Sequence, residues 1–276
     1  MATTPPLNIT GHTRVYGMIA DPIGHVRAPM VYNPVFEERG IDAVMVPLHI
    51  TPENLADAMR SLARVPNFGG VCVSIPHKME LAAICDELGL AARLTDAVNA
   101  VRFEDGRLIG DNFDGKGFVA GLRGEGIALV GKNILMIGAG GAARAIAAAL
   151  AETDAASLTI ANRTQARAAE IVTMLDGVGT SLRLDVASVD GLEATLAEAD
   201  IIINTTSLGL HDGDALPCDL AAARAEAVVA DIIMIPAVTA WMKAAEDRGL
   251  RVHAGRHMLD YQRDLMGVFL NMWVDE

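Results

Sequence analysis

Short apolar runs alternate with longer amphipathic stretches in the first part of the chain. Residues 14–20, 43–50 and 69–75 are apolar runs of strand length. Residues 28–39 are predicted to form a helix that closes at Gly40, and Thr51-Pro52-Glu53 is typical of a second helix start, extending to about residue 64. This β-α-β-α-β order predicts an α/β domain.

The same alternation continues to the end of the chain. A further helix is expected from Pro76-His77-Lys78, and a hairpin from 98–103 and 108–110 about Asp105-Gly106. The chain is predicted to be helical again after Asp114. Apolar strands are expected at 134–137, 157–161, 199–205 and 227–233, with helices at 238–248 and from 257 to about 273.

One stretch has the pattern of a dinucleotide-binding turn. The apolar run 134–137 is followed by Gly138, Ala139, Gly140, Gly141 and Ala142, and then by an alanine-rich helix. Glycines permit the tight turn and the close approach of the pyrophosphate, and the helix N-terminus favours an anion. The same glycine-rich turn also joins strands to helices for packing reasons alone, so this motif needs support from the residues that follow.

That support comes at the end of the next predicted strand. Asn162, Arg163, Thr164 and Arg167 follow it, whereas an NAD site usually has an acidic residue there for the ribose hydroxyls. Two arginines beside a helix start suit a 2′-phosphate, because guanidinium binds phosphate through paired hydrogen bonds. We therefore predict NADP rather than NAD; the alternative is a solvated pair of surface arginines.

The net charge and the cysteine count indicate which kinds of binding partner to expect. The 276 residues carry a net charge of −13, which argues against nucleic acid or an anionic membrane as partner. Cys72, Cys85 and Cys218 are odd in number and lack the spacing of metal ligands, so we expect reduced thiols and no metal. With neither a signal peptide nor a transmembrane run, we expect a cytoplasmic monomer or homodimer acting on a small molecule.

Polar residues with catalytic potential follow the predicted strands of the first half. Ser74 and Lys78 lie just past a strand end, where ligands bind in open α/β sheets. Asn99 and Asp114 follow later. Lys, Asn and Asp around one hydroxyl would suit an alcohol dehydrogenase, because one group takes the proton while hydride leaves. Alternatively, Lys78 is a surface lysine and Asp114 a helix N-cap.

Together, these motifs resemble the shikimate/quinate dehydrogenase family along nearly the whole chain. The matching segments are 17–29, 73–78, 97–99, Gly110-Asp111-Asn112-x-Asp114-Gly115, 138–142, Asn162-Arg-Thr-x-x-Arg167, Asn204-x-Thr-Ser207-x-Gly209, Asp231-x-x-x-x-Pro236-x-x-Thr239 and Gly255-x-x-Met258-Leu259-x-x-Gln262.

The resemblance implies two α/β domains, a substrate domain of residues 1–113 plus 255–276 and a Rossmann-type NADP domain of residues 114–254. It implies that Lys78 and Asp114 are the catalytic pair and that Ser74, Asn99 and Gln262 contact the substrate. By the same resemblance, the cofactor contacts include the glycine-rich turn, the arginine segment, Thr205, Ile232, Gly255 and Met258.

The chain departs from the family where the substrate carboxylate would bind. The family has Ser-x-Ser-Pro, and this chain has Val26-Arg27-Ala28-Pro29. Losing two hydrogen bonds to a charged group, worth roughly 1.5–3 kcal/mol each, would weaken binding by roughly two to four powers of ten. Three more positions differ: Cys72 replaces Asn, Phe113 replaces Thr and Met234 replaces Tyr.

These differences lead to a hypothesis about the substrate. We expect an NADP-dependent dehydrogenase for a cyclic or short polyol or hydroxy acid. Its far end would be held by Arg27, or by an apolar wall of Val26, Ala28, Phe113 and Met234. His25 and His77 are candidates for additional acid–base groups; the alternative, which we favour, is that each is a supporting or partly exposed histidine. The alternatives are a genuine shikimate or quinate dehydrogenase with a rebuilt carboxylate site, and a non-catalytic NADP-binding sensor.

Overall fold

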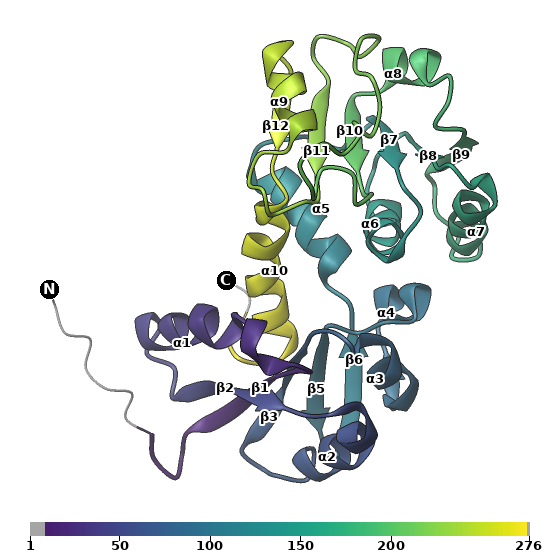
Figure 1. The fold of residues 1–276 in the computed structure, drawn as a ribbon. Helices are drawn as coiled ribbons and strands as arrows, with labels where there is room; N and C mark the ends of the chain where they lie inside the picture. The colour runs from purple at the N-terminus through teal and green to yellow at the C-terminus, as the bar shows by residue number, and fades with distance from the viewer. Residues whose placement is uncertain (1–8, 275–276) are drawn as a thin grey trace, which may run out of the picture. The chain divides into compact units, whose positions relative to one another are not determined.

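The computed structural model describes residues 9–274, and the chain divides into two compact units (Figure 1). The first unit contains the described residues up to Phe113 together with those from Arg263 onward, and the second contains Asp114–Gln262. We expected the second boundary at residue 255; the division into compact units falls inside the last helix, between Gln262 and Arg263.

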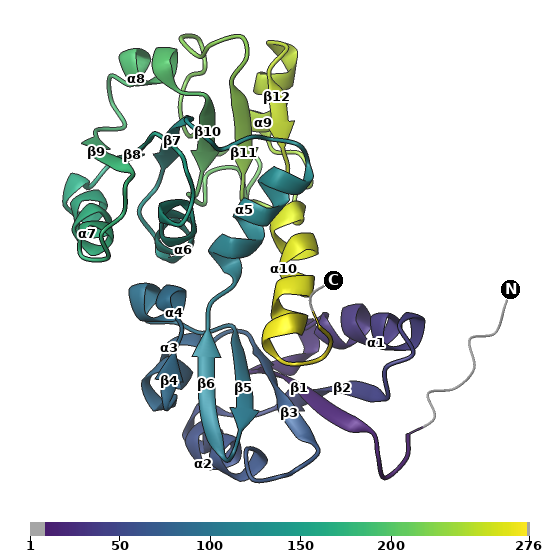
Figure 2. The same ribbon diagram turned by 180° about the vertical axis from the view of Figure 1, so that it is seen from behind.

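The first unit is a mixed sheet covered by helices (Figure 2). Its sheet has the strand order β2-β1-β3-β5-β6-β4. β1 pairs in parallel with β2 and β3, and β5 pairs antiparallel with β3 and β6. The elements in chain order are β1 (Arg14–Ala20), η1 (Ile23–His25), α1 (Ala28–Glu38), β2 (Ala43–His49), η2 (Pro52–Asn54), α2 (Leu55–Leu62), β3 (Phe68–Val73), α3 (Lys78–Ile84), β4 (Glu87–Leu88), α4 (Leu90–Thr95), β5 (Ala100–Glu104) and β6 (Arg107–Asp111).

Successive side chains of the strands in the first unit point to opposite faces of the sheet, so an apolar layer forms on each face. Val71 and Val73 point to the side covered by α2 and α3. Cys72, between them, lies in the layer formed with α1 and the last helix, α10 (Arg256–Phe269), whose residues from Arg263 onward belong to this unit. The predicted hairpin is confirmed, with Asp105 and Gly106 both at positive φ, as a tight two-residue turn requires.

The second unit has a parallel sheet with the order β12-β11-β10-β7-β8-β9 (Figure 1). Counted from β7, this is the 3-2-1-4-5-6 order of a dinucleotide-binding fold, and every pairing between described strands is parallel. Its elements are α5 (Asp114–Gly124), β7 (Asn133–Ile137), α6 (Gly141–Ala151), β8 (Ser157–Ala161), α7 (Gln165–Asp176), β9 (Arg183–Ala187), α8 (Glu193–Glu198), β10 (Ile201–Asn204), β11 (Val228–Asp231), α9 (Ala240–Asp247), β12 (Arg251–His253) and α10 (Arg256–Phe269).

Both faces of β7 are buried, which explains its continuous apolar sequence. Ile134 and Met136 pack with α5, α6 and α7. Leu135 and Ile137 pack on the opposite side with α8 and α9. The strand therefore lies at the centre of the second unit, and the glycine-rich turn that follows it is held between two packed layers.

The last helix ends earlier than the apolar pattern predicts. α10 stops at Phe269, not near residue 273, because Asn271 takes a left-handed φ of 54° and the Met272 N–H donates to the Gly267 carbonyl. The chain then turns back so that the ring of Trp273 lies against Gly267. The apolar residues after Phe269 therefore lie in the segment that turns back and not in the helix.

All three cysteines are free thiols. Burial raises the pKa of Cys72 and of Cys85 to about 12, and that of Cys218 to about 11. Such thiols are unreactive near neutral pH, which suits structural residues. None of the helices in the described part of the chain has the length and apolar character needed to cross a bilayer.

Candidate active site

Ser74 and His25 lie together after neighbouring strands of the first unit. Ser74 follows β3, and its N–H donates to the carbonyl of Ile19 in β1. His25 belongs to the short η1 turn after β1, and its Nε2 is 3.4 Å from Ser74 Oγ. Both strands are parallel, so their carboxyl ends meet at one edge. The structure thus groups an imidazole with the predicted substrate-binding hydroxyl.

Lys78 is the first residue of α3, and its backbone is tied to the sheet. The carbonyl of Lys78 accepts a hydrogen bond from the N–H of Val98, at 2.9 Å. The preceding residue, His77, is fully buried, and its Nε2 is 2.7 Å from the carbonyl oxygen of Ile50. Since that ring is buried against this carbonyl, His77 anchors the start of α3.

Asn99 is buried at the start of the hairpin, with 4% of its surface exposed. Its Oδ1 accepts the N–H of Phe113, and its backbone carbonyl accepts the N–H of Val73. These bonds fix the orientation of the amide. They also connect Asn99 to Phe113, the residue before Asp114, with which the second unit begins.

The acidic motif before α5 contains two residues with structural contacts, Asp111 and Asn112, and one catalytic candidate, Asp114. Asp111 is buried and accepts the N–H groups of Ala92 and Asn112. Asn112 donates through Nδ2 to the carbonyl of Ala97. These contacts shape the loop, so Asp111 and Asn112 hold the chain that delivers Asp114 to the start of α5.

In the second unit, Gln262 and Asp114 are hydrogen bonded to each other. Gln262 Nε2 donates to Asp114 Oδ1 at 2.8 Å, from α10 to the first residue of α5. The two helices approach closely because Gly117 has no side chain: a Cβ there would lie 2.5 Å from the carbonyl oxygen of Met258. Met258 itself is buried in the core against α5.

The glycine-rich turn has the geometry expected for a pyrophosphate site. Gly138 has a φ of 114°, which favours glycine, and Thr205 packs against it. An added Cβ at Gly140 or Gly141 would meet nothing within 4 Å, so the backbone is open on that side. Gly140 is the N-cap of α6 and has no side-chain cap, which leaves the first N–H groups of the helix for a ligand.

The arginine segment follows β8, beside the turn after β7. Arg163, Thr164 and Arg167 are exposed, and Thr164 is the N-cap of α7 without a side-chain cap bond. Asn162 Nδ2 donates to the carbonyl of Thr164 and so shapes the segment. Within residues 9–274 neither Arg163 nor Arg167 makes an ion pair, so both cations are available to a phosphate.

Two further motifs of the resemblance form a buried polar network that sequence reasoning did not foresee. Asn204 donates to Asp231 Oδ1, and Thr239 donates through its hydroxyl to Asp231 Oδ2. Burial raises the pKa of Asp231, while the hydrogen bonds that it accepts, the first from the Ile233 N–H, oppose this. The network ties the loops after β10 and β11 together.

The remaining predicted cofactor residues surround this network and the glycine-rich turn. Thr205 is buried and donates through Oγ1 to the carbonyl of Ile137, so its hydroxyl stabilises the end of β7. Gly255 lies against the backbone of Ile232, where a Cβ would come within 2.5 Å of the carbonyl carbon. These residues thus shape the carboxyl edge of the sheet, while Ala139 and Ala142 are partly buried in the turn.

The residues predicted to hold the far end of the substrate are only partly brought together. Val26 and Ala28 are half-buried and pack on one cluster that also contains Phe113. Phe113 is only 6% exposed, and its ring centroid is 5.0 Å from that of Phe269. Phe113 is therefore mainly a core residue and not the open wall that we expected. Met234 is half-buried in the second unit, and Arg27 is exposed at the start of α1.

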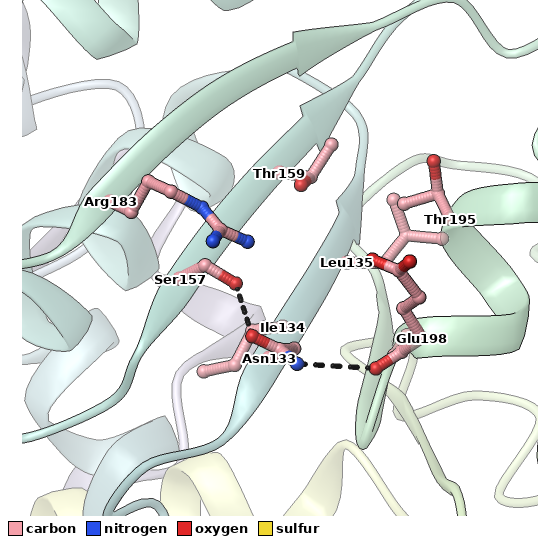
Figure 3. Close-up of a pocket in the computed structure, with 9 residues that line it drawn as sticks. Asn133, Ile134, Leu135, Ser157, Thr159, Arg183, Thr195 and Glu198 are labelled. Atoms are coloured by element: carbon pink, nitrogen blue, oxygen red, sulfur yellow. Dashed lines mark hydrogen bonds between the residues drawn. The ribbon is translucent and has the colours of Figure 1, made fainter.

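A small pocket lies at the opposite, amino-terminal edge of the second sheet (Figure 3). Asn133, Ser157 and Arg183, which open β7, β8 and β9, line it together with Glu198. Its volume is about 30 Å³; Ser157 donates to Asn133 Oδ1, and Asn133 Nδ2 donates to the carbonyl of Glu198. The pocket has room only for water, so it is not a cofactor site.

Comparisons with known proteins agree with this geometry. Residues 18–101 match the family model for the shikimate dehydrogenase substrate binding domain, and residues 123–211 match that for shikimate / quinate 5-dehydrogenase. The shikimate dehydrogenase (NADP(+)) of Rubrobacter xylanophilus is 40% identical over 92% of this chain and 89% of its own length. That of Geobacillus kaustophilus is 41% identical over 90% of this chain and 89% of its own length. The names of both relatives specify the cofactor predicted here.

Solved structures give the same result. Shikimate 5-dehydrogenase from Listeria monocytogenes, in complex with shikimate and NAD, superimposes with a TM-score of 0.88 at 30% identity, covering 96% of this chain and 94% of that one. The ligand-free 5-ketofructose reductase of a Gluconobacter strain has a TM-score of 0.87 at 31% identity, covering 97% and 96%. The chain belongs to the shikimate/quinate dehydrogenase family.

Proposed function

We propose that this protein is an NADP-dependent oxidoreductase that transfers hydride between NADP and a secondary alcohol of a polyhydroxylated small molecule. The observation that carries the proposal is the combination of an open glycine-rich turn after β7 with two arginines after β8 that form no ion pair within residues 9–274. The turn fits a pyrophosphate, and the arginines fit the 2′-phosphate that distinguishes NADP from NAD.

The cofactor supplies the hydride acceptor, and the chain supplies its position. The uncapped N-terminus of α6 would hold the pyrophosphate, and Arg163 and Arg167 would hold the 2′-phosphate. The carboxyl edge shaped by Ile232, Gly255 and Met258 would receive the nicotinamide end. We therefore assign cofactor binding to the second unit and the larger part of substrate binding to the first.

Proton transfer is assigned to Lys78 and Asp114, jointly. The hydroxyl proton leaves as the hydride does, and one of these two groups would take it while the other orients the oxygen. Asn99, whose amide is fixed by Phe113 and the hairpin, orients a neighbouring hydroxyl. Ser74 would supply a hydroxyl to the substrate, and His25 Nε2 lies beside it.

The far end of the substrate differs from shikimate in this proposal. Val26 and Ala28 replace the serines of the family and pack on an apolar cluster, so they supply no donors for a carboxylate. The likeness to a protein named 5-ketofructose reductase supports a sugar-like ketone or polyol, since that name describes a substrate without a carboxylate. The free thiols support a cytoplasmic setting.

A second candidate is a genuine shikimate dehydrogenase with a rebuilt carboxylate site. The curated relatives at 40% and 41% identity favour it, since both are named shikimate dehydrogenase (NADP(+)). Arg27 is the group that would replace the serines, because it is exposed at the start of α1 and forms no ion pair within residues 9–274.

The test is NADP⁺ reduction followed by absorbance, with shikimate, quinate, cyclic polyols, and keto-sugars in the reverse direction. We expect a neutral polyol or keto-sugar to give the highest kcat/KM. Shikimate as the best substrate, with Arg27→Met abolishing its turnover, would establish the second candidate instead. Tight NADP binding without turnover on the whole panel would favour a non-catalytic sensor.

The double variant Val26→Ser/Ala28→Ser tests the cause of the altered preference. Restoring the two hydroxyls should raise kcat/KM for shikimate by roughly two powers of ten, since each hydrogen bond to a charged group is worth about 1.5–3 kcal/mol. The neutral substrate should gain nothing. An equal change for both substrates would show that residues 26 and 28 do not determine the preference.

A further inference from the structure

Asp231, the last residue of β11, carries a fully buried carboxylate. Its Oδ1 accepts hydrogen bonds from Asn204 Nδ2 at 3.1 Å and from the Ile233 N–H at 3.0 Å. Its Oδ2 accepts a hydrogen bond from the Thr239 hydroxyl at 2.9 Å. Asn204 and Thr239 are fully buried as well. Because a buried carboxylate costs free energy unless donors satisfy it, these contacts hold the surrounding chain in one geometry.

The carboxylate connects two loops and a helix. On one side, Asn204 Oδ1 accepts hydrogen bonds from the N–H and the hydroxyl of Thr206, in the loop after β10. On the other side, the Thr239 hydroxyl accepts the Met242 N–H and so caps α9. The loop after β10 and the loop between β11 and α9 are therefore both fastened to Asp231.

The backbone of Ile232, directly after Asp231, is held between these loops. Its N–H donates to the carbonyl of Asn204 at 3.2 Å. Its carbonyl lies against Gly255, where an added Cβ would lie 2.6 Å from this oxygen and 2.5 Å from the carbonyl oxygen of Ile233. The carboxylate of Asp231 thus determines how the backbone after β11 meets the backbone after β12.

We propose that Asp231 is a positioning residue for the nicotinamide end of NADP. Because its carboxylate is fully buried, it acts through the backbone of Ile232 and Gly255 and not by contact with the cofactor. The proposal rests on the proposed function, which assigns the nicotinamide to the edge shaped by Ile232, Gly255 and Met258. Hydride transfer depends on where the ring lies, and a displacement of about 1 Å can cost about 10²-fold in rate.

The main test is Asp231→Leu, which keeps a side chain of similar size but accepts no hydrogen bond. Two ligands are compared: NADP, and adenosine 2′,5′-bisphosphate, which has the 2′-phosphate but no nicotinamide. We expect the Kd for NADP to rise roughly tenfold and kcat on the best substrate to fall roughly 100-fold. The Kd for the bisphosphate should stay within about threefold of the wild-type value, since the hydrogen bonds of Asp231 do not involve the α6 N-terminus or the arginine segment.

Asp231→Asn is the second variant, because leucine in this buried polar site also costs stability. The amide keeps an acceptor oxygen for Asn204 and Ile233 but places a donor opposite the Thr239 hydroxyl. We expect a smaller change in the same direction, with kcat lowered roughly fivefold, as for one lost hydrogen bond. In both variants, binding of the bisphosphate shows that the second unit is folded.

Asp200→Leu is the matched control, at the opposite edge of the same sheet. Asp200 directly precedes β10, and its carboxylate accepts hydrogen bonds from Lys132 Nζ and from the Asn133 N–H. Its replacement should lower the free energy of unfolding. The ratio of the two Kd values and kcat should remain those of the wild-type protein, because this edge lies away from the cofactor.

The two Kd values decide the proposal even if no compound is turned over. A loss confined to NADP binding or kcat in the Asp231 variants, and absent from Asp200→Leu, supports the positioning role. Equal losses for both ligands, or unchanged NADP binding and kcat, would show that Asp231 only stabilises the fold; the proposed function would then stand without this proposal. A wild-type protein that binds neither ligand would overturn the proposed function and this proposal together.

Discussion

A Cβ atom at Gly138 would lie 2.5 Å from the hydroxyl oxygen of Thr205, and that hydroxyl donates to the carbonyl of Ile137 at 2.8 Å. Gly138 follows β7 and Thr205 follows β10, the two neighbouring strands at which the order of the second sheet reverses. Ligands of this fold bind at that point. The contact therefore determines how close the turn can lie to the sheet.

Gly138→Ala should destabilise the fold, whereas Gly140→Ala should weaken only cofactor binding. Gly138 has a φ of 114° and no space for a side chain; strain of this kind costs about 1–3 kcal/mol. Gly140 has a φ of −91° and nothing within 4 Å of an added Cβ, so its alanine should leave the free energy of unfolding unchanged. It should nevertheless weaken NADP binding at least tenfold by crowding the pyrophosphate.

Urea unfolding and NADP titration on both variants check this difference. Adding Thr205→Ala to Gly138→Ala should recover part of the lost stability, because it removes the atom that the new Cβ meets. Equal stability losses in the two glycine variants would contradict the assignment of Gly138 to the fold and Gly140 to the ligand.

Arg163→Met and Arg167→Met should lower affinity for NADP but not for NAD. Each guanidinium is exposed and unpaired among residues 9–274, and a hydrogen bond to a charged phosphate is worth about 1.5–3 kcal/mol. We expect roughly a 10- to 100-fold rise in Kd for NADP per substitution, measured by fluorescence titration. Arg183→Met is the control, since Arg183 pairs with Asp185 and opens β9 at the opposite edge of the sheet. Parallel losses for both cofactors would exclude a 2′-phosphate contact.

Lys78→Met should reduce kcat and leave NADP binding nearly unchanged. A positioned acid–base group contributes typically ~10²–10⁴-fold, and Lys78 belongs to the first unit, whereas the glycine-rich turn and the arginines belong to the second. Steady-state kinetics on the best substrate and a cofactor titration separate the two effects. Lys243→Met, which removes an exposed lysine paired with Asp247 on α9, should change neither. A wild-type rate in Lys78→Met would remove this lysine from the mechanism.

Local sequence predicts the parts of this protein that depend on periodicity and glycine chemistry. The buried strand β7, the turn at Gly138 and the N-cap at Thr164 follow from residues adjacent in the chain. The hairpin turn at Asp105-Gly106 is of the same kind. Each of these features is local, so composition and spacing are enough to find it.

Features formed between distant residues were not predictable in this way. The bond from Gln262 to Asp114 joins positions 148 residues apart, and no pattern in either helix indicates it. Phe113 was expected in an apolar wall because the family has Thr there, yet its ring is packed on Phe269. Substitution patterns identify positions that differ, but burial decides whether a residue faces a ligand or the core.

His253 should make the stability of the fold depend on pH between about 6.5 and 4. It is buried beside His257 and Phe118, and burial, with the nearby His257, lowers its pKa to about 4 from the usual 6.5. In that range the unfolded chain binds a proton that the folded chain does not. The contribution of the neutral ring to the free energy of unfolding is therefore fully present above pH 6.5. It decreases, by up to about 3 kcal/mol, as the pH falls toward 4.

His253→Phe keeps an aromatic ring against Phe118 but removes the titration. Its free energy of unfolding, measured in urea at several pH values across the range from neutral to mildly acidic, should decrease less steeply than that of the wild-type protein. His12→Gln, at an exposed histidine, should retain the wild-type slope. Because the other titratable groups are common to the wild-type protein and His253→Phe, an unchanged slope in that variant would mean that His253 is protonated in the folded state as readily as in the unfolded chain.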